Sequence, residues 1–450
     1  MKIAVISGSP KGKNSITLQS VRYLAKQFPT NQFEIHHVGQ QIKLLENDEK
    51  MSLLMEKLIE SHLILWVYPV YTFLAPYQLH RFIELLKAHP RAAELAGKWS
   101  SQLTTSKHFY DYTAHRYVEE NAADIGLKVI RGLSADMDDL LSLRGQKELK
   151  GFWQFVQFEM GMEKPREKEN TKNQSQIKLS VSKLKIRQFD TVIVTSAEEN
   201  DHELLAMIET FKAVYERPTR VVNIRELRID GGCLGCFNCA TDGKCIYKDG
   251  FDHILREQIQ SASAIVYAGT IKDHSLGSRF KLYDDRQFCN GHRTVNMGMP
   301  IAYILNGNYE KECNLKLVIE GRSEVGHQFL VGIATNESQD DEVTRAAIVK
   351  IAKTMNYALE HKMLLPQNFL GIGGMKIFRD LIYIMKGLMK ADHRFYKAKG
   401  FYDFPQKKIG MRLKMQVIGG LMSLPSVKKK MKSQMNQAII KPYQKVIDKN

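Results

Sequence analysis

Cysteine is absent from the first 232 residues of this 450-residue chain, and no apolar run reaches the roughly 18 residues of a membrane-spanning helix. The longest apolar run, Leu63 to Pro76, has the length of a strand and a loop. The apolar stretch behind Met1 covers only residues 3–6, which is too short for a signal peptide and is typical of a buried strand. We therefore expect a cytoplasmic protein.

Acidic residues are scarce in the last 90 positions. Residues 361–450 contain 19 Lys and Arg but only four acids, whereas the whole chain has 65 basic and 49 acidic residues. The first 360 residues are therefore almost neutral, and nearly all of the net charge of +16 belongs to the C-terminal segment. This distribution argues against a nucleic-acid footprint over the main body, because such a footprint needs basic residues where the substrate is held.

Short β-branched runs alternate with helical patterns along the chain. In the first part, strands are predicted at residues 2–6, 33–38, 63–67, 102–105 and 127–130. After a polar stretch at 164–178, which predicts a linker, further strands are predicted at 191–195, 220–224 and 264–268. The segment 59–68 resembles 259–267, so the two parts look like copies of one unit. Alternating strands and helices predict two doubly wound parallel sheets.

The loop from Gly8 to Thr17 connects the first buried strand to a helix. Backbone N–H groups and the helix dipole favour an anion at such a place. The side chains that add hydrogen-bond donors or positive charge are Ser9, Lys11, Asn14, Ser15 and Thr17. A phosphate suits this loop, but the Walker pattern and the spaced GxGxxG glycines are missing, which disfavours a triphosphate or a classical dinucleotide. The alternative is an ordinary strand-to-helix turn.

A second loop follows the third strand and reads Pro69, Val70, Tyr71, Thr72 and Phe73. In a doubly wound sheet this loop lies beside the first one at the carboxyl edge, where ligands bind. Its aromatic and backbone groups suit a flat, partly apolar ring. Packing of the aromatic side chains on their own helix is the alternative.

These two loops together resemble those of the flavodoxin-like NAD(P)H-dependent FMN reductases, and the similarity extends over residues 1 to about 160. The resemblance implies that the first loop holds the FMN phosphate and that the second borders the isoalloxazine ring. It also implies that the loop beginning at Thr105 and Ser106 completes the flavin pocket. His108, Tyr110, Asp111 and His115 follow there and are candidates to face the substrate.

Four of the six cysteines fall within 13 residues, and they are Cys233, Cys236, Cys239 and Cys245. In a chain without a secretory signal this density favours metal or redox chemistry over disulfides. A compact run suits a cubane cluster, whereas zinc sites usually use two separated pairs. The spacing resembles that of the iron-sulfur flavoproteins, which implies a [4Fe-4S] cluster; free thiols are the alternative.

The second copy departs from the flavin pattern. Its first loop contains Glu198, Glu199 and Asp201, which would repel a phosphate, and the loop at 268–273 has no aromatic-proline sequence. We therefore expect one flavin site per chain, in the first copy, and one cysteine site, in the second.

The sequence thus predicts an α/β chain of two tandem flavodoxin-like doubly wound domains with a basic α-helical C-terminal extension. The expected parts are an FMN-binding domain (1–163), a linker (164–178), a second domain with the cysteine loop and a degenerate flavin site (179–360), and a basic, Met-rich helical extension (361–450). The extension suits an anionic membrane face or an acidic partner, with a packed helical appendage as the alternative.

The expected function is FMN-dependent oxidation and reduction. The electron donor would be a reduced nicotinamide (NADH or NADPH) or a [4Fe-4S] cluster, and the acceptor would be a small molecule or a protein. No residue is assigned as a catalytic acid or base, because the cofactor carries the chemistry. A flavodoxin-like electron carrier without turnover of its own is the alternative.

Overall fold

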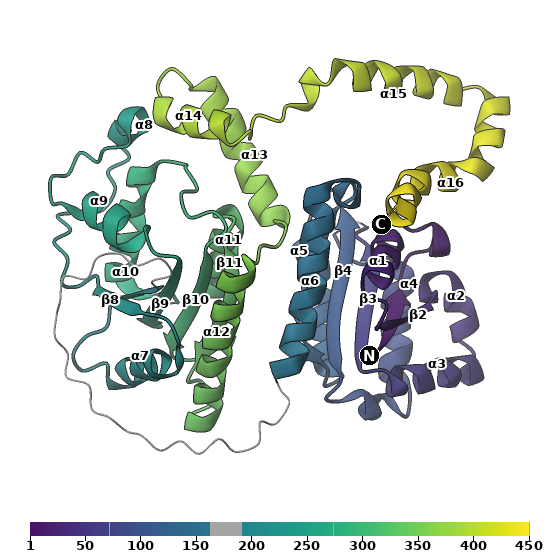
Figure 1. Ribbon diagram of the computed structural model, residues 1–450, viewed down its shortest axis with the longest axis horizontal. Helices are drawn as coiled ribbons and strands as arrows, with labels where there is room; N and C mark the ends of the chain where they lie inside the picture. Colours follow the sequence, from purple (N-terminus) through teal and green to yellow (C-terminus); the bar gives the residue numbers. More distant parts are fainter. Residues whose placement is uncertain (72, 163–190, 273, 450) are drawn as a thin grey trace. The chain divides into compact units, whose positions relative to one another are not determined.

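The computed structural model describes residues 1–71, 73–162, 191–272 and 274–449 (Figure 1). Their contacts divide the chain into two compact units. The first unit is formed by the described residues of Met1–Pro165, Leu365–Phe369 and Phe404–Asn450, and the second by those of Arg166–Leu364 and Leu370–Asp403. The predicted linker at 164–178 lies outside the described residues.

The first unit is built on a parallel sheet. Its strands are β1 (Lys2–Ser7), β2 (Gln32–His36), β3 (Leu63–Pro69), β4 (Trp99–Ser106), β5 (Lys128–Val129) and β6 (Leu133–Asp136). They are arranged in the order β2-β1-β3-β4-β5, with β6 paired to β4. β1 and β3 are continuous apolar runs because each is covered on both faces, and Val5 and Leu65 at their centres are fully buried.

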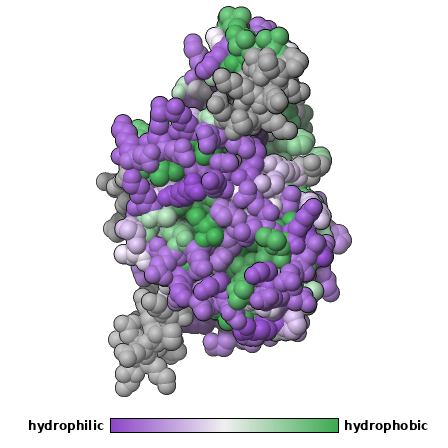
Figure 2. Space-filling view, turned by 90° about the vertical axis from the view of Figure 1, so that its right-hand side faces the viewer, coloured by the Kyte–Doolittle hydropathy of each residue, from purple (hydrophilic) through white to green (hydrophobic). Residues whose placement is uncertain are grey.

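Helices cover this sheet, and Figure 1 shows them beside it. They are α1 (Ile16–Gln27), α2 (Val38–Leu45), α3 (Asp48–Glu60), α4 (Tyr77–Ala88), α5 (Asp111–Asp124) and α6 (Leu143–Met162). Two helices from the end of the chain, α15 (Ile409–Met422) and α16 (Pro425–Lys449), also belong to this unit. The face drawn in Figure 2 is mostly hydrophilic and carries its apolar side chains in small separate patches.

The second unit repeats the sheet of the first. Its strands are β7 (Thr191–Thr195), β8 (Thr219–Asn223), β9 (Ala264–Thr270), β10 (Pro300–Asn306) and β11 (Phe329–Thr335). Their order, β11-β10-β9-β7-β8, places the second strand at one edge beside the first, as in the first unit. All described pairings in both sheets are parallel. The predicted pair of doubly wound flavodoxin-like sheets is confirmed.

The helices of the second unit contribute to three apolar clusters, two that include strands of its sheet and one that does not. They are α7 (His202–Val214), α8 (Asn238–Asp242), α9 (Phe251–Ile254), α10 (Gly277–Arg286), α11 (Cys313–Val325), α12 (Asp341–His361), α13 (Phe369–Ile384) and α14 (Lys390–Ala398). A short 3₁₀ helix, η5 (Gln287–Asn290), follows α10.

Two strand predictions need correction. The predicted strand at 127–130 has only two residues in the sheet, and a separate strand, β6, follows at Leu133–Asp136. The predicted strand at 33–38 ends at His36, because Val38 starts α2 and its side chain is buried in the core.

The basic C-terminal segment is helical, as predicted, but it is shared between the units. At its end α16 packs on α1, where the Lys26 ammonium donates to the backbone carbonyl of Ile447 at 2.7 Å. The Tyr443 hydroxyl donates to the carbonyl of Met137 at 2.9 Å. None of the described helices combines the length and apolar character that crossing a membrane requires.

Candidate functional site

The first strand-end loop of the first unit presents a compact set of donors. A 3₁₀ turn, η1 (Gly12–Asn14), joins β1 to α1, and the Ser15 amide donates to the Gly12 carbonyl at 2.9 Å. Gly12 has a φ of +50°, which favours glycine, and an added Cβ would displace the side chain of Gln40. Ser15 caps α1 without using its hydroxyl, which leaves that group available to a ligand. The first N–H groups of α1 have no partner within the helix and favour an anion.

The second loop is held in a tight four-residue turn. Tyr71 and Leu74 exchange backbone hydrogen bonds of 2.8 and 3.1 Å. Phe73 has a φ of +73°, which is unusual for a residue with a side chain, and its carbonyl accepts a 2.5 Å hydrogen bond from the Thr113 hydroxyl. Its ring packs against Phe109, with 5.3 Å between ring centroids. The turn therefore has a fixed position at the carboxyl edge of the sheet.

The strand-end loops surround one cavity of about 240 Å³. Its wall consists of Ser9, Lys11, Ser15, Ile16, Thr17, Pro69, Val70, Tyr71, Phe73, Thr105, Ser106, Lys107, Phe109 and Met137. Thr17 from α1 and Thr105 from β4 share a buried hydroxyl-hydroxyl hydrogen bond of 2.6 Å, which ties two of these loops together. The first loop contributes Lys11 and three hydroxyl side chains to the lining, and the aromatic residues come from the other two loops.

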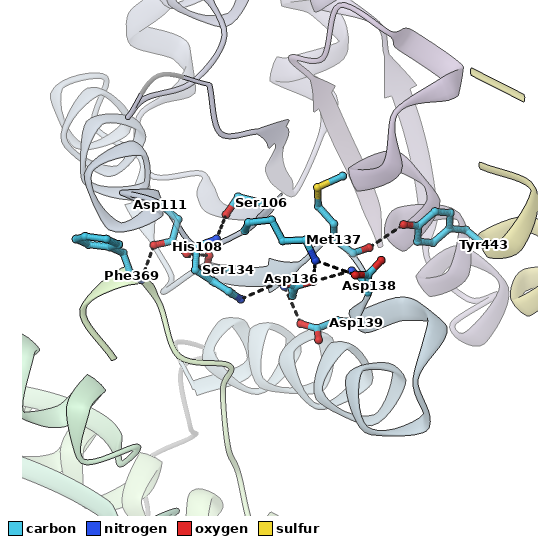
Figure 3. A network of polar contacts seen from close by, with 11 residues as sticks. Ser106, His108, Asp111, Ser134, Asp136, Met137, Asp138, Asp139, Phe369 and Tyr443 are labelled. Atoms are coloured by element: carbon cyan, nitrogen blue, oxygen red, sulfur yellow. Dashed lines mark hydrogen bonds and ion pairs between the residues drawn. The ribbon is translucent and has the colours of Figure 1, made fainter. Parts of the chain in front are cut away.

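A polar network supports the third loop (Figure 3). The Asp111 carboxylate, fully buried, accepts hydrogen bonds from the Ser134 hydroxyl at 2.5 Å and from the Phe369 amide at 2.7 Å, and lies 2.9 Å from Nδ1 of His108. Burial opposes ionisation of Asp111, but the hydrogen bonds from His108 and Ser134 outweigh it and lower the pKa of this carboxyl. Asp111 is therefore a charged anchor of the loop.

The same network continues toward the cavity wall. The Lys107 ammonium binds the carboxylates of Asp136 and Asp138 at 2.6 and 2.8 Å. Met137 lies between these two acids in the sequence and its carbonyl is held by Tyr443, as Figure 3 shows. The side chain of Lys107 and the backbone of Met137, two residues of the cavity wall, are thus held by hydrogen bonds to residues outside the lining.

The predicted cysteine loop belongs to the second unit. Cys233, Cys236, Cys239 and Cys245 line one small cavity together with the buried Cys289. Gly235 and Gly243 have φ values of +64° and +83°, so the loop turns sharply at glycine positions. Within the described parts of the chain, no three His, Cys, Asp or Glu side chains are arranged as a metal-binding group. The donor atoms suit a cluster, but the thiols do not converge on one point.

A buried ion pair lies behind this loop. The Arg286 guanidinium binds the Asp249 carboxylate through two hydrogen bonds of 2.6 and 3.0 Å, and both side chains are almost completely buried. Burial opposes ionisation of Asp249, but the hydrogen bond from Arg286 prevails and lowers its pKa to about 2. Arg286 also donates to the carbonyl of Gly231 at 3.1 Å and covers the ring of Tyr247, so it fastens both ends of the cysteine loop.

Comparison with known proteins gives a family match for part of the first unit. Residues 1–130 match the family model described as NADPH-dependent FMN reductase. This match lies within the first unit and covers less than half of the chain. It agrees with the NAD(P)H-dependent flavin oxidoreductase that the sequence predicts.

Two curated relatives of this chain are described as iron-sulfur flavoproteins. One, from Archaeoglobus fulgidus, is 26% identical over 176 residues, which cover 38% of this chain and 79% of the relative. The other, from Clostridioides difficile, is 22% identical over 134 residues, which cover 29% of this chain and 60% of the relative.

Solved structures with a similar fold include the flavoenzyme NAD(P)H:(acceptor) oxidoreductase FerB from Paracoccus denitrificans. It is 17% identical, with a TM-score of 0.30, over 36% of this chain and 95% of that chain. An FMN-dependent NADH-azoreductase from Bacillus anthracis is 11% identical, with a TM-score of 0.28, over 36% of this chain and 98% of that chain.

The cavity of the first unit is lined by ten of the twelve residues predicted to bind the flavin. Asn14 is not part of its wall, and Thr72 lies outside the described residues. Four lining residues were not predicted, namely Ile16, Lys107, Phe109 and Met137. Met137 directly follows β6, so its position becomes visible only once β6 is known to extend the sheet beside β4.

The candidate substrate-facing residues lie elsewhere. His108 and Asp111 bind each other beneath the loop, and neither lines the cavity. His115 lies within 2.8 Å of the Thr104 hydroxyl, and burial lowers its pKa to about 4. The Tyr110 ring stacks on that of Phe369, with 4.4 Å between centroids. All four residues therefore make contacts within the first unit that support its structure.

The carboxyl edge of the second sheet is filled by hydrogen bonds between protein groups. The Thr270 hydroxyl donates to Asp201 at 3.1 Å, and the Asn336 amide donates to Asn306 at 2.8 Å. Glu198 forms an ion pair with Arg225. Acidic side chains therefore occupy the place where the first unit carries Ser9 and Lys11, and the degenerate flavin site of this unit stays a prediction.

Proposed function

We propose that this chain is an FMN-dependent oxidoreductase that binds one FMN in the cavity of the first unit. Electrons would come from reduced nicotinamide, from a [4Fe-4S] cluster or from both. They would pass through the FMN to an organic or protein acceptor. The observation that supports this most strongly is that side chains from three strand-end loops, chosen from the sequence as a flavin site, line a single cavity.

The loop around α1 suits the phosphate. Ser9, Ser15 and Thr17 bring hydroxyl groups to the cavity, and Lys11 brings the positive charge. Together with the first N–H groups of α1 they form a donor set for a dianion. We assign the phosphate end of FMN to this part of the cavity.

The aromatic part of the cavity suits the flavin ring. Tyr71 and Phe73 come from the second loop and Phe109 from the third, and all three line the cavity. Bound FMN would supply the acceptor for a hydride from reduced nicotinamide. The protein's part is to orient the ring, and the exposed fractions of Tyr71 and Phe73, 42% each, leave this side of the cavity open to a second reactant.

The cysteine loop is proposed to hold the cluster. The four thiols share one small cavity. The two curated relatives of the chain, both described as iron-sulfur flavoproteins, support the assignment. Arg286 would then lie beside the cluster as a buried positive charge. Anaerobic reconstitution followed by iron and sulfide analysis tests this, with Cys236→Ala expected to lose both and Cys313→Ala, an exposed cysteine outside the cavity, expected to keep both. Absence of iron and sulfide in the unaltered chain would rule out the cluster.

FMN binding is tested by titration of flavin fluorescence with two lysine variants. Lys11 and Lys13 lie in the same loop and are both exposed, but only Lys11 lines the cavity. Lys11→Gln should weaken FMN binding roughly two- to fivefold, as expected for loss of one exposed charge contact, and should leave riboflavin binding unchanged. Lys13→Gln should change neither. Failure of the unaltered chain to take up FMN would end the proposal.

Turnover distinguishes an enzyme from an electron carrier. We expect the FMN-loaded chain to oxidise NADH or NADPH rapidly when a free quinone is present. A flavin spectrum without such turnover would favour the carrier.

The basic segment is proposed to contact an anionic membrane surface. On α15, Ile409, Met411, Leu413 and Val417 each expose more than half of their surface, and Arg412 and Lys414 lie among them. Binding to vesicles containing phosphatidylserine, but not to phosphatidylcholine alone, is expected, with Leu413→Ser weakening it. Equal recovery with both vesicle types would rule this out and leave an acidic protein partner.

A further inference from the structure

The second unit contains a large cavity that lies away from the carboxyl edge of its sheet. Its volume is about 550 Å³, within the range of roughly 300–1,000 Å³ that is usual for ligand sites. Gln260, Asn296 and Gln328 line it, and each precedes a strand, so the cavity reaches toward the amino ends of the strands. Helices α10, α11, α13 and α14 supply other parts of the wall.

Aromatic rings form much of this wall. Tyr267 and Tyr303 stand side by side on the sheet, with ring centroids 5.2 Å apart. Phe378 of α13 packs on His292 at 4.4 Å. Because rings prefer to pack in stacked or edge-to-face arrangements, these walls favour a flat aromatic guest.

The loop that closes the cavity is fixed in place. The fully buried Asp392 accepts a 2.8 Å hydrogen bond from Arg293 and lies 3.3 Å from Nδ1 of His292. Gly291 has a φ of +58°, and a Cβ at this position would lie 2.4 Å from Oδ1 of Asp392. The loop can therefore approach α14 only with glycine at this position. Its contacts with Asp392 fix the position of this part of the cavity wall.

Two polar atoms at this loop have no protein partner. The hydroxyl oxygen of Thr294 and the side-chain oxygen of Asn296 are buried, and neither has a hydrogen-bond partner among the residues that the structure describes. Both residues line the cavity. Since leaving a buried polar atom unpaired costs free energy, a guest that hydrogen-bonds to these two atoms would be stabilised.

A basic groove adjoins the aromatic cavity. It measures about 520 Å³, and its wall shares Gln260, Asn290, Arg293 and Val295 with that of the cavity. Lys244, Arg256 and Arg394 complete its basic lining, and Asp242 is the one acid among the lining residues. Arg293 pairs with Asp392 and Arg256 with Asp252, so Lys244 and Arg394 provide the positive charge that attracts an anionic group.

We propose that the second unit has a ligand site of its own, which binds a planar aromatic molecule carrying a carboxylate or a phosphate. The ring occupies the cavity between Tyr303 and Phe378, where it meets Thr294 and Asn296. The anionic group lies in the adjoining groove near Arg394. This site is independent of the flavin site proposed for the first unit, and it involves no side chain of the first unit.

The ring part of the proposal is tested with a blocked cavity. Gly321 of α11 lines the cavity, and a Cβ added there meets no atom within 4 Å, so Gly321→Leu extends into the cavity without a backbone clash. Gly161 of α6, in the first unit, is equally open and provides the matched control. Both changes replace a helical glycine by a better helix former, so folding should be preserved.

The probes are 2-naphthoate and 2-naphthyl phosphate, titrated by calorimetry into the full FMN-treated chain. We expect at least one of them to bind, Gly321→Leu to abolish the binding heat, and Gly161→Leu to leave it unchanged. The two probes distinguish a carboxylate site from a phosphate site. No heat from either probe at millimolar concentration, or equal binding by Gly321→Leu and the unaltered chain, would overturn the proposal.

The anion part is tested with a charge variant. Arg394 is exposed on α14 and lines the groove, whereas Arg345 is exposed on α12 and lines neither cavity. Arg394→Gln should weaken binding of the anionic probe roughly two- to fivefold and should leave binding of the neutral methyl ester of 2-naphthoate unchanged. Arg345→Gln should have no effect. Equal responses of the two variants would refute the placement of the anionic group.

Discussion

Replacing Arg286 by methionine is expected to destabilise the second unit by about 3 kcal/mol. Methionine keeps the apolar stem but leaves the Asp249 carboxylate buried without its counter-charge. Removing one member of a buried ion pair costs about 3–5 kcal/mol because the remaining charge is no longer compensated. The two hydrogen bonds of 2.6 and 3.0 Å between these side chains would both be lost.

The local contacts place the effect at the lower end of that range. Asp249 would still accept hydrogen bonds from the backbone amides of Asp230 at 3.0 Å and of Phe251 at 3.2 Å. These two donors keep the carboxylate partly compensated. Loss of the guanidinium over the Tyr247 ring, 4.4 Å from its centroid, adds about 0.5–1 kcal/mol.

The positions of the tryptophans supply the assay. Trp66, Trp99 and Trp153 all belong to the first unit, so tryptophan fluorescence reports its unfolding alone, whereas far-ultraviolet circular dichroism reports both units. At a slope of about 2 kcal/mol per molar urea, a loss of 3 kcal/mol moves the second unit's midpoint down by about 1.5 M. The fluorescence midpoint should stay where it is.

The control for this experiment is Arg228→Met. Arg228 also pairs with a carboxylate, that of Asp230, but its side chain is 76% exposed, so the dichroism transition should not move. A shift below about 0.5 M for Arg286→Met, or an equal shift of the fluorescence transition, would refute the reasoning about a buried pair confined to the second unit.

Three further predictions concern the first unit, and tryptophan fluorescence measures each. Because burial lowers the pKa of His115 to about 4, the unfolded chain binds a proton at higher pH than the folded one, so stability should fall by up to about 3 kcal/mol as pH drops from about 6.5 to about 4. His115→Gln should remove that dependence, and an unchanged profile would contradict it. Thr17→Val should cost about 1–2 kcal/mol by leaving the Thr105 hydroxyl unpaired, and Thr17→Ser, which keeps the hydroxyl, should cost less; equal losses would refute this. Asp111→Asn should cost about 2–3 kcal/mol, because an amide cannot accept all the hydrogen bonds that the carboxylate receives, and an unmoved urea midpoint would argue against that role.

The sheets and the first loop could be predicted because their signals are local. β3 and β9 are uninterrupted apolar runs, and such runs between turn residues mark strands buried on both faces. The donors of the first loop lie close together in the sequence directly after β1, so their proximity in space follows from the local chain. β5 was predicted two residues too long, and β6 and the start of α2 at Val38 were missed, because these features depend on packing against other elements.

The rest of the flavin cavity depends on register between strands. Phe109 and Met137 follow different strands, and their convergence requires β6 to pair with β4. A turn of the same kind follows the third strand of each unit, and the sequence did not predict it for another reason. Tyr71 with Leu74, and Lys272 with Ser275, form the same bridge, while Phe73 and His274 adopt positive φ without being glycine. Residues of such different chemistry give no common sequence signal for this backbone conformation.

The hydrogen bond from Tyr443 to Met137 has a consequence for how the protein is made. The two residues are 306 positions apart, and the whole second sheet lies between them in the chain. At synthesis rates of 5–20 residues per second, Met137 waits roughly 15–60 s for its partner to leave the ribosome. A nascent chain that stops after the second sheet would possess both sheets, yet one wall of its first cavity would lack the contact that secures it.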